Sequence, residues 1–499
     1  MEHSNMTHNF HTSKEFSESQ NSEISRRRLL QLIGYSVTGI AGISILEACG
    51  GPNPPHPVEV TVTPNGTVTT HNGATRKIAP YFLGYNNVPI HSTSWDNPNA
   101  VKAAVQFNPG TLRYPGGTVA NYWDWQKGWF LPGAPNGFLS APQSIYRLRE
   151  LQIAVQATGA IPIYVLNLLT SDLNTQLEML STAQSMGLPV QFVELGNEFY
   201  LRNPNDYVTK FPTGADYGKM ATSWIRAIRD KFPNVKIAAV GGVPTDQSSD
   251  PRKAHWNQEL LQSLEGADAL TQHPYVSVKH NMIGNGNGTT DTQSAMNIID
   301  AISARWQQFE GQLQSLPQNM KVWFTEYNIV DKSNDVFHTW IHGISAAKMS
   351  LTFLEEERTE LACFYDMIGK SGYEVIASNQ QFAPTAAGWS MRLLGDTMKG
   401  MISAQKIDFG ANITNNGGTS SPLLGWIFND GTHHQAFIVN SSASSFTIDV
   451  DPVFAQGSHF QQLASDPLKR ITGPDSLTIT SGTPRNQISL PAFSLTQLK

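Results

Sequence analysis

Two glutamates in this sequence stand where paired carboxylate chemistry would require them. Glu198 follows the short apolar run 192–195, and Glu326 follows the run 322–325. Both runs have the length and composition of buried strands. If these strands are parallel and close into a barrel, the residues that follow them converge on one face. One carboxyl group could then stay protonated and donate to a leaving oxygen while the other stays ionised, as glycoside hydrolysis requires.

The elements that would position these glutamates alternate between short apolar strands and longer stretches of helical period, which is typical of βα units. Eight strand-like runs occupy roughly 300 residues, compatible with a (β/α)8 barrel of about 250 residues that carries inserted loops. The runs cover residues 81–86, 111–114, 161–167, 192–195, 236–240, 269–273, 322–325 and 361–365. The sequence therefore predicts a fold of the α/β class, with a (β/α)8 TIM barrel over residues 77–400.

The helical period disappears after residue 400, and short alternating strands take its place. They cover residues 424–428, 435–440, 446–450, 476–481 and 488–495. This pattern predicts a C-terminal antiparallel β-sandwich over residues 401–499. Residues 58–76 predict a hairpin whose turn is Asn65-Gly66. We expect this N-terminal hairpin to join the sandwich, because an isolated hairpin is marginal in water.

The first 48 residues have the features of an export signal. The stretch 25–30, Ser-Arg-Arg-Arg-Leu-Leu, resembles a twin-arginine signal, and an apolar run follows it. The run closes with Leu-Glu-Ala before Cys49, which resembles a lipoprotein cleavage site, although Glu47 departs from that pattern. We expect a lipid on Cys49 and a linker over residues 49–57; simple cleavage and an uncleaved anchor remain the alternatives. The protein would then be an exported cell-surface lipoprotein or extracellular.

Composition excludes several classes of protein. The chain has 499 residues with 40% hydrophobic and 15% charged, which suits a large compact fold. Its formal charge of -6 argues against a nucleic-acid partner. Cys49 and Cys363 offer no disulfide framework, and Cys363 should be a buried, inert thiol. No dinucleotide fingerprint or phosphate loop occurs in the sequence, so we expect no cofactor and no metal. Membrane contact would come only through the lipid or signal segment.

Several motifs together resemble clan A glycoside hydrolases. Asn197-Glu198 after the fourth strand and Glu326 after the seventh are similar to their acid/base and nucleophile. Other motifs resemble the α-L-arabinofuranosidase and β-glucuronidase/heparanase-like families: Leu-Arg-Tyr-Pro-Gly-Gly at 112–117, Gln-His-Pro-Tyr at 272–275, the last barrel helix at 384–400 and the final strand at 490–495. The resemblance extends from about residue 77 to the end of the printed sequence. It implies a carbohydrate substrate.

The resemblance also implies a role for individual residues. Glu198 would be the general acid/base and Glu326 the nucleophile of a retaining double displacement, with the two carboxyl groups about 5 to 5.5 Å apart. Asn197 would hold the sugar 2-hydroxyl, and Tyr275 would orient Glu326. Arg113 would lie beneath the nucleophile and favour its ionised form, because a nearby cation lowers the pKa of a carboxyl group.

Some of these residues have a second interpretation. Alternation places Glu194 on the same face as Glu198, which predicts an ion-paired acid deeper in the barrel. Arg113 could equally be the structural partner of that acid. We expect His273 to be a hydrogen-bonded wall residue rather than a base. The aromatic residues near the predicted mouth either contact sugar faces or pack the loops; they are Trp95, Tyr122, Trp123, Trp125 and Trp129.

The sequence thus predicts an exported retaining glycoside hydrolase that acts on plant or microbial polysaccharides or oligosaccharides. Its sugar is left open between the arabinofuranosidase-like and β-glucuronidase-like alternatives. A non-catalytic carbohydrate-binding surface lipoprotein on the same scaffold is the alternative from another class. Because both glutamates are present, the sequence favours the enzyme.

Overall fold

Eight parallel strands close into a barrel in the computed structural model, which describes residues 67–68, 71–90, 93–139, 145–244, 250–279, 282, 291–409, 421–450, 454, 458–484 and 486–499. Each barrel strand pairs with the next, and the eighth pairs with the first, so the ring is closed. In ring order they are β3 (Leu83–Asn86), β4 (Thr111–Tyr114), β7 (Ile161–Val165), β8 (Phe192–Glu194), β9 (Lys236–Val240), β10 (Ala269–Thr271), β12 (Lys321–Asp331) and β13 (Thr359–Phe364). The TIM barrel is confirmed, and all eight predicted strands are present.

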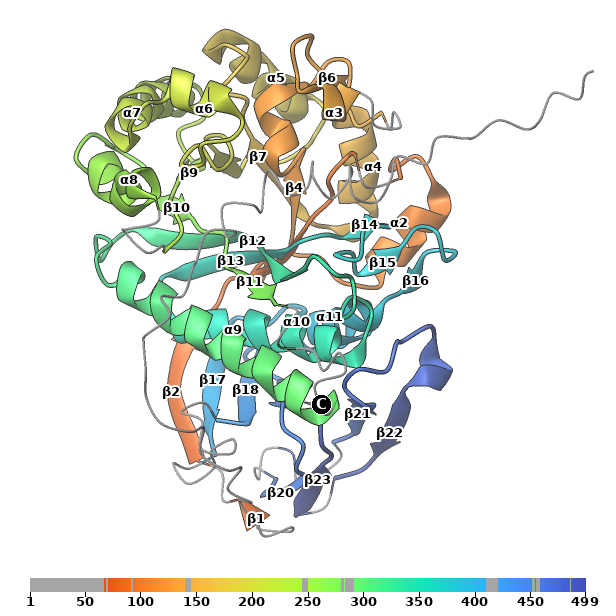
Figure 1. The fold of residues 1–499 in the computed structure, drawn as a ribbon. Coiled ribbons are helices and arrows are strands. Elements are labelled where there is room, and N and C mark those ends of the chain that lie inside the picture. The colour runs from red at the N-terminus through yellow and green to blue at the C-terminus, as the bar shows by residue number, and fades with distance from the viewer. Residues whose placement is uncertain are drawn as a thin grey trace, which may run out of the picture.

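Helices cover the outside of the ring, as the sequence period predicts (Figure 1). They are α2 (Pro98–Val105), α4 (Leu148–Thr158), α5 (Leu173–Ser185), α7 (Gly214–Lys231), α8 (Pro251–Leu261), α9 (Asp291–Leu313), α10 (Trp340–Thr352) and α11 (Ala386–Met398). Local side chains fix where several begin. Asp172 accepts from the Thr175 amide at the start of α5, and Thr213 and Asp216 form a capping box on α7. These contacts satisfy the free amides of a first helical turn.

The lower part of the barrel interior is filled by apolar side chains. The side chains of this layer are all completely buried; they are Ile163, Phe192, Ala238, Ala269, Trp323, Leu361 and Cys363. Burial raises the pKa of the Cys363 thiol to about 12, so the cysteine is buried and unreactive as expected. Because this layer is packed, polar side chains can gather only above it, toward the carboxyl ends of the strands.

Two antiparallel sheets form the C-terminal sandwich, which confirms the predicted fold. The larger runs in the order β2 (His71–Lys77), β17 (Ser403–Asp408), β18 (Leu423–Asn429), β19 (His434–Asn440), β24 (Ser494–Leu498), β21 (Phe460–Ala464) and β22 (Thr478–Gly482). The smaller runs β1 (Thr67–Val68), β20 (Phe446–Asp449) and β23 (Gln487–Leu490). Within the smaller sheet, β20 and β23 are antiparallel, whereas β1 lies parallel to β20.

One predicted sandwich strand is wrong in its extent. Residues 488–495 do not form a single strand but are divided between β23 and β24, which belong to different sheets. Pro491 has no amide to donate to a ladder, and Phe493 has a φ of 44°, outside the range of extended backbone. The chain therefore turns between the sheets at this point, and the Phe493 amide donates to the Ser442 carbonyl.

The N-terminal arm of the described chain joins both sheets of the sandwich. β1 pairs with β20, and β2 pairs with β17. Most of the predicted hairpin, including its Asn65-Gly66 turn, lies outside the described residues, as do the signal segment, the linker and Cys49. Of the helices within the described part of the chain, none has both the length and the apolar character needed to cross a membrane.

Helices α10 and α11 lie between the barrel and the sandwich (Figure 1). The Trp340 side chain of α10 donates to the Phe493 carbonyl at 2.6 Å. Arg76 of β2 donates to the carbonyls of Leu354 and Glu356 at 2.5 and 2.8 Å. These polar contacts, one buried and two half-buried, hold the sandwich against the side of the ring.

Candidate active site

The structure brings Glu198 and Glu326 together at the carboxyl ends of the barrel strands. Glu198 follows β8 and Glu326 lies in β12, with β9 and β10 between them in the ring. Their side chains are 2% and 0% exposed. One carboxylate oxygen of each and a ring nitrogen of His273 all lie within 4.8 Å of one another. The two acids therefore face each other, as the sequence predicts.

The turn after β8 holds Glu198 in an uncommon conformation. Gly196 has a φ of 93°, and a Cβ at this position would lie 2.2 Å from the Phe199 ring, so only glycine fits. Glu198 itself has a φ of 50°, which a non-glycine residue adopts only at an energetic cost. The surrounding contacts must therefore fix this turn, and they aim the carboxyl group into the barrel mouth.

Arg113 on β4 joins the nucleophile candidate to a deeper acid. Its Nη1 donates to Glu326 Oε1 at 2.5 Å. Its Nε and Nη2 donate to the two oxygens of Glu194 at 2.7 and 2.8 Å. All three side chains are completely buried. Both interpretations of Arg113 are thus correct, since one guanidinium pairs with Glu194 and with Glu326.

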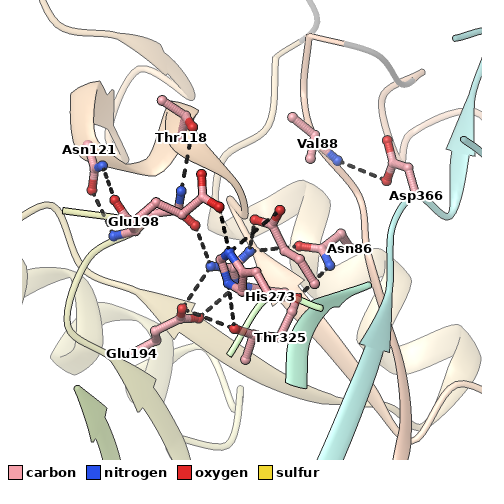
Figure 2. A network of polar contacts seen from close by, with 12 residues as sticks. Asn86, Val88, Thr118, Asn121, Glu194, Glu198, His273, Thr325 and Asp366 are labelled. Carbon is pink, nitrogen blue, oxygen red and sulfur yellow. Dashed lines mark hydrogen bonds and ion pairs between the residues drawn. The ribbon is translucent and has the colours of Figure 1, made fainter. Parts of the chain in front are cut away.

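Asparagines complete the ring of acceptors around Arg113. Asn86 and Asn197 accept from it through Oδ1 at 3.0 and 2.7 Å. Asn121 binds both backbone groups of Asn197, donating to its carbonyl at 2.8 Å and accepting from its amide at 3.0 Å. The network around Asn86, Asn121 and Glu194 converges on the same centre (Figure 2). Asn197 is therefore fixed beside the catalytic pair; its contact with a 2-hydroxyl stays a prediction.

The second oxygen of Glu326 is bound by Tyr275, whose hydroxyl donates to Oε2 at 2.7 Å. The sequence predicts this partner. Gly117 lies close by with a φ of 66°, and a Cβ there would be 3.9 Å from Glu326 Oε1. A Cβ at this distance would be in ordinary van der Waals contact, so the positive φ of Gly117, and not a lack of space, favours glycine beside the carboxylate.

Glu198 has a different set of partners. His273 Nδ1 lies 2.9 Å from Glu198 Oε1, and the Tyr200 hydroxyl donates to the same oxygen at 3.0 Å. The other ring nitrogen of His273 lies 3.0 Å from Thr325 Oγ1. Glu198 Oε2 is buried and has no hydrogen-bond partner among the described residues. His273 is a hydrogen-bonded wall residue, as expected, and one oxygen of Glu198 is left to meet a ligand.

These partners drive the two acids in opposite directions. Burial raises the pKa of Glu198, and contacts with His273 and Tyr200 offset only part of that rise. Burial also acts to raise the pKa of Glu326, but His273, Arg113 and Tyr275 together outweigh burial and hold the pKa below its ordinary value. The surroundings therefore favour the protonated form of Glu198 and the ionised form of Glu326, which is the difference between two carboxyl groups that acid-assisted substitution needs.

Comparison with known proteins now places this geometry in context. No protein-family model and no curated protein matches the sequence. Solved structures do match. An α-L-arabinofuranosidase from Thermotoga maritima in complex with arabinose has a TM-score of 0.63 at 16% identity, covering 87% of this chain and 99% of that one. A second arabinofuranosidase has a TM-score of 0.66 at 15% identity, covering 87% and 100%.

A third neighbour is a 4-O-α-L-rhamnosyl-β-D-glucuronidase from Fusarium oxysporum. Its TM-score is 0.60 at 14% identity, and the match covers 87% of this chain and 100% of that one. The chain is similar to clan A glycoside hydrolases. At these identities the similarity establishes the fold alone, and the assignment of individual residues rests on the geometry described above.

The cluster could also be considered as a metal site, since Glu198, His273 and Glu326 each offer one ligand atom. Ligand atoms around zinc, with bonds of about 2.0 to 2.2 Å, lie at most about 4.4 Å apart. Atoms spread over as much as 4.8 Å would have to move closer. Arg113 is also in contact with Glu326 and would repel a second cation. The donor set therefore fits proton transfer better than metal binding.

Three of the five aromatic residues predicted near the mouth differ in their surroundings. Trp95 is 0% exposed and donates to the Tyr146 hydroxyl at 2.9 Å, and its contact with a sugar stays a prediction. Trp123 packs edge-on against Phe130. Trp125 is 8% exposed, and its Nε1 has no hydrogen-bond partner among the described residues. Sugar contact by Trp123 and Trp125 stays a prediction.

Sequence reasoning missed some residues of the cluster. Asn86 and Thr325 stand at or near the carboxyl ends of predicted strands, so the rule that strand ends converge could have found both. Asn121 and Tyr200 reach the cluster from loops, and no pattern in the sequence indicates where loop side chains point. Their contribution depends on backbone geometry that only the structure provides.

Proposed function

We propose that the protein is a retaining glycoside hydrolase. The observation that carries this proposal is the close pair of Glu198 and Glu326, whose facing oxygens lie within 4.8 Å. Retaining enzymes separate their carboxyl groups by about 5 to 5.5 Å, whereas inverting enzymes need about 6.5 to 9.5 Å to admit a water molecule. The spacing favours direct attack by one carboxylate over attack by an intervening water.

In the first step a carboxylate oxygen of Glu326 attacks the anomeric carbon as the bond to the leaving oxygen breaks. Glu198 gives its proton to that oxygen. We assign this proton to Oε2, because Oε1 already accepts from Tyr200 and Oε2 has no partner among the described residues. The step yields a free alcohol, a glycosyl ester on Glu326 and an ionised Glu198.

In the second step a water molecule attacks the same carbon. Glu198 takes a proton from the water, and the ester bond to Glu326 breaks, which releases the sugar with its original anomeric configuration. Arg113 and Tyr275 contact the two oxygens of Glu326. Both therefore stabilise the carboxylate as it leaves. Asn197 would bind the 2-hydroxyl throughout.

The substrate would be a plant or microbial polysaccharide or oligosaccharide. The solved structures with this fold include arabinofuranosidases and a rhamnosyl-glucuronidase, so arabinofuranosyl and glucuronyl groups are the first candidates for the sugar that is transferred. The sequence of residues 25–49 supports export and attachment by a lipid on Cys49. Such an enzyme would act on sugars outside the membrane.

A screen of aryl glycosides tests the proposal. Arabinofuranoside, glucuronide, xyloside, glucoside and galactoside are offered to the chain from residue 57 onward, and cleavage of at least one is expected. Product configuration, followed by NMR, should be retained. A 2-fluoro glycoside of the cleaved sugar should add its mass to the peptide that contains Glu326. Absence of cleavage and labelling, together with saccharide binding, would favour the non-catalytic alternative.

A further inference from the structure

Basic side chains gather on the Glu198 side of the catalytic pair. Arg202 follows β8, Lys253 stands in the first turn of α8, and Arg305 lies on α9. We call these three residues the basic cluster. Asp250, which accepts from the α8 amide of Arg252, pairs with Arg202 at 3.2 Å. Asp250 balances the charge of Arg202. Lys253 and Arg305 add further positive charge beside this pair.

Arg305 has no carboxylate partner among the described residues. Its Nη1 donates to the Pro244 carbonyl at 3.1 Å and to Gln308 Oε1 at 2.7 Å, and its Nε has no partner there. The guanidinium also lies over the Phe309 ring at 4.7 Å. Burial lowers its pKa to about 10. A half-buried cation without a carboxylate partner among the described residues is costly, so a ligand that brought a negative charge would be bound favourably here.

Lys253 lines a groove between α8 and α9 with a volume of about 490 Å³. Val243 and Pro244, which follow β9, line one end of it, and Gln312 lies across from Lys253 on α9. The groove thus begins at the barrel face that carries the catalytic pair. Its volume falls within the range of about 300 to 1,000 Å³ found for small-molecule sites, which leaves room for saccharide units.

The basic cluster lies on the side where the leaving group must be. Glu198 donates the proton to the leaving oxygen in the proposed mechanism. Lys253 is near enough for Glu198 to affect its pKa: burial lowers that pKa, and Asp250 and Glu198 offset part of the effect. The opposite side of the network carries Asp366 next to Val88 (Figure 2). Asp366 is completely buried, so that side carries an acid where the Glu198 side carries cations.

We infer that the leaving saccharide is anionic: it carries a carboxylate or sulfate group that Lys253 and Arg305 bind in and beside the α8–α9 groove. The inference rests on the proposed function, because it uses Glu198 to define the leaving-group side. It narrows the substrate to a sugar attached to an acidic chain. The charge asymmetry of the cleft, rather than its size, would select that chain.

The test compares two aryl glycosides of the sugar found in the screen. Their phenols are matched in acidity, and one carries a carboxylate remote from the phenol oxygen. Wild type should prefer the acidic substrate in kcat/KM by roughly 10- to 100-fold, as expected for one charge-assisted hydrogen bond. Lys253→Gln and Arg305→Gln should each lower that preference by about tenfold. Added salt should lower it in wild type, and a sulfate analogue shows which anion is preferred.

Three controls make the result decisive. Lys253→Arg and Arg305→Lys keep the charge and should keep most of the preference. Lys231→Gln removes an exposed cation at the end of α7, before β9 begins, and should leave the preference unchanged. Equal kcat/KM for both substrates in wild type, or an unchanged preference in both charge-removing variants, would overturn the inference while leaving the hydrolase assignment intact.

Failure of the hydrolase assignment itself is recognised separately. If no aryl glycoside is cleaved, the binding of trigalacturonic acid and of a neutral galactose trisaccharide is measured by calorimetry. Tighter binding of the acidic trisaccharide, lost in Lys253→Gln, would still support an anionic saccharide at this groove. Equal binding of both, or binding of neither, would overturn it.

Discussion

The Glu326 side and the Glu198 side of the active site each hold a buried glutamate, but their surroundings shift the two pKa values in opposite directions. Each presents a glutamate that is almost completely buried. Burial alone would raise both pKa values. On the Glu326 side, Arg113 and Tyr275 each donate to a different oxygen. On the Glu198 side, both partners meet one oxygen, and the other has no partner among the described residues.

The difference teaches that the number and charge of the donors, rather than depth in the barrel, decides which acid is ionised. A full positive charge faces Glu326 directly. Glu198 is contacted by a histidine that it shares with Glu326. The positive charge on the Glu198 side, in the basic cluster, lies farther out and faces the leaving group. A substitution on one side can therefore be compared with a substitution on the other side as its control.

The largest effect is expected from removing the charge of the nucleophile. Glu326→Gln should lower kcat by at least about 10⁴-fold, because the amide cannot form the glycosyl ester. Steady-state kinetics on the best aryl glycoside measures this. The fold should persist, so circular dichroism and the unfolding midpoint should match wild type closely. Wild-type turnover in this variant would contradict the assignment of Glu326.

Removing the acid should have a smaller effect that depends on the leaving group. Glu198→Ala should lower kcat by about 10² to 10⁴-fold for poor leaving groups, the usual contribution of general acid catalysis. Activated aryl glycosides should be affected less, and azide should restore part of their turnover by attacking the glycosyl ester in place of water. A glycosyl azide with the original configuration is the expected product. No rescue by azide with any activated substrate would count against Glu198 as the acid/base.

Arg113 connects the two halves of the buried network, so its loss should affect stability as well as rate. Arg113→Met keeps most of the volume but leaves Glu194 and Glu326 buried without their cation. Breaking a buried pair in this way costs about 3 to 5 kcal/mol. Urea unfolding of wild type and variant measures the change. Glu194→Gln is the matched control, since it removes the charge of the deeper acid while leaving Arg113 paired with Glu326.

Much of the fold and the central cluster could be predicted from the sequence for a physical reason. Barrel strands can be recognised in the sequence as short apolar runs, and their carboxyl ends converge on one face whatever the conformation of the loops. That is why Glu198 and Glu326 could be placed together although they are far apart along the chain, whereas the position of Arg113 beneath Glu326 followed from the family resemblance. The double role of Arg113 could not be resolved, because alternation gives the face of a strand and not the distance between two acids.

Other features could not be predicted, for equally specific reasons. Trp95 follows the first strand, as the sequence shows, but its hydrogen bond to the Tyr146 hydroxyl joins two loops that no sequence pattern brings together. Strands β17 and β21 were not predicted, because their exposed faces carry lysine and glutamine and lack a clear apolar alternation. Asn121 and Tyr200 depend on loop conformation, which a sequence pattern does not encode.

Two tyrosines allow the two sides to be compared by the same small substitution, the loss of one hydroxyl group. Tyr275→Phe removes one hydroxyl that donates to Glu326 Oε2 at 2.7 Å. This donation lowers the pKa of Glu326, so its loss should raise that pKa. Activity requires ionised Glu326 and is lost as pH falls through its pKa. The acid limb of the kcat/KM profile should therefore move to higher pH, and kcat/KM at the optimum should fall by about tenfold. An unmoved acid limb would contradict this role.

Tyr200→Phe is the mirror experiment and should have the smallest effect. The Tyr200 hydroxyl donates to Glu198 Oε1 and lowers the pKa of Glu198, against the larger rise caused by burial. Removing it should raise that pKa further. Activity requires protonated Glu198 and is lost as pH rises through its pKa, so the alkaline limb should move to higher pH with little loss at the optimum. If Tyr275→Phe and Tyr200→Phe shifted the same limb, the two acids would not be titrating as separately held groups, and the opposed environments described above would be wrong.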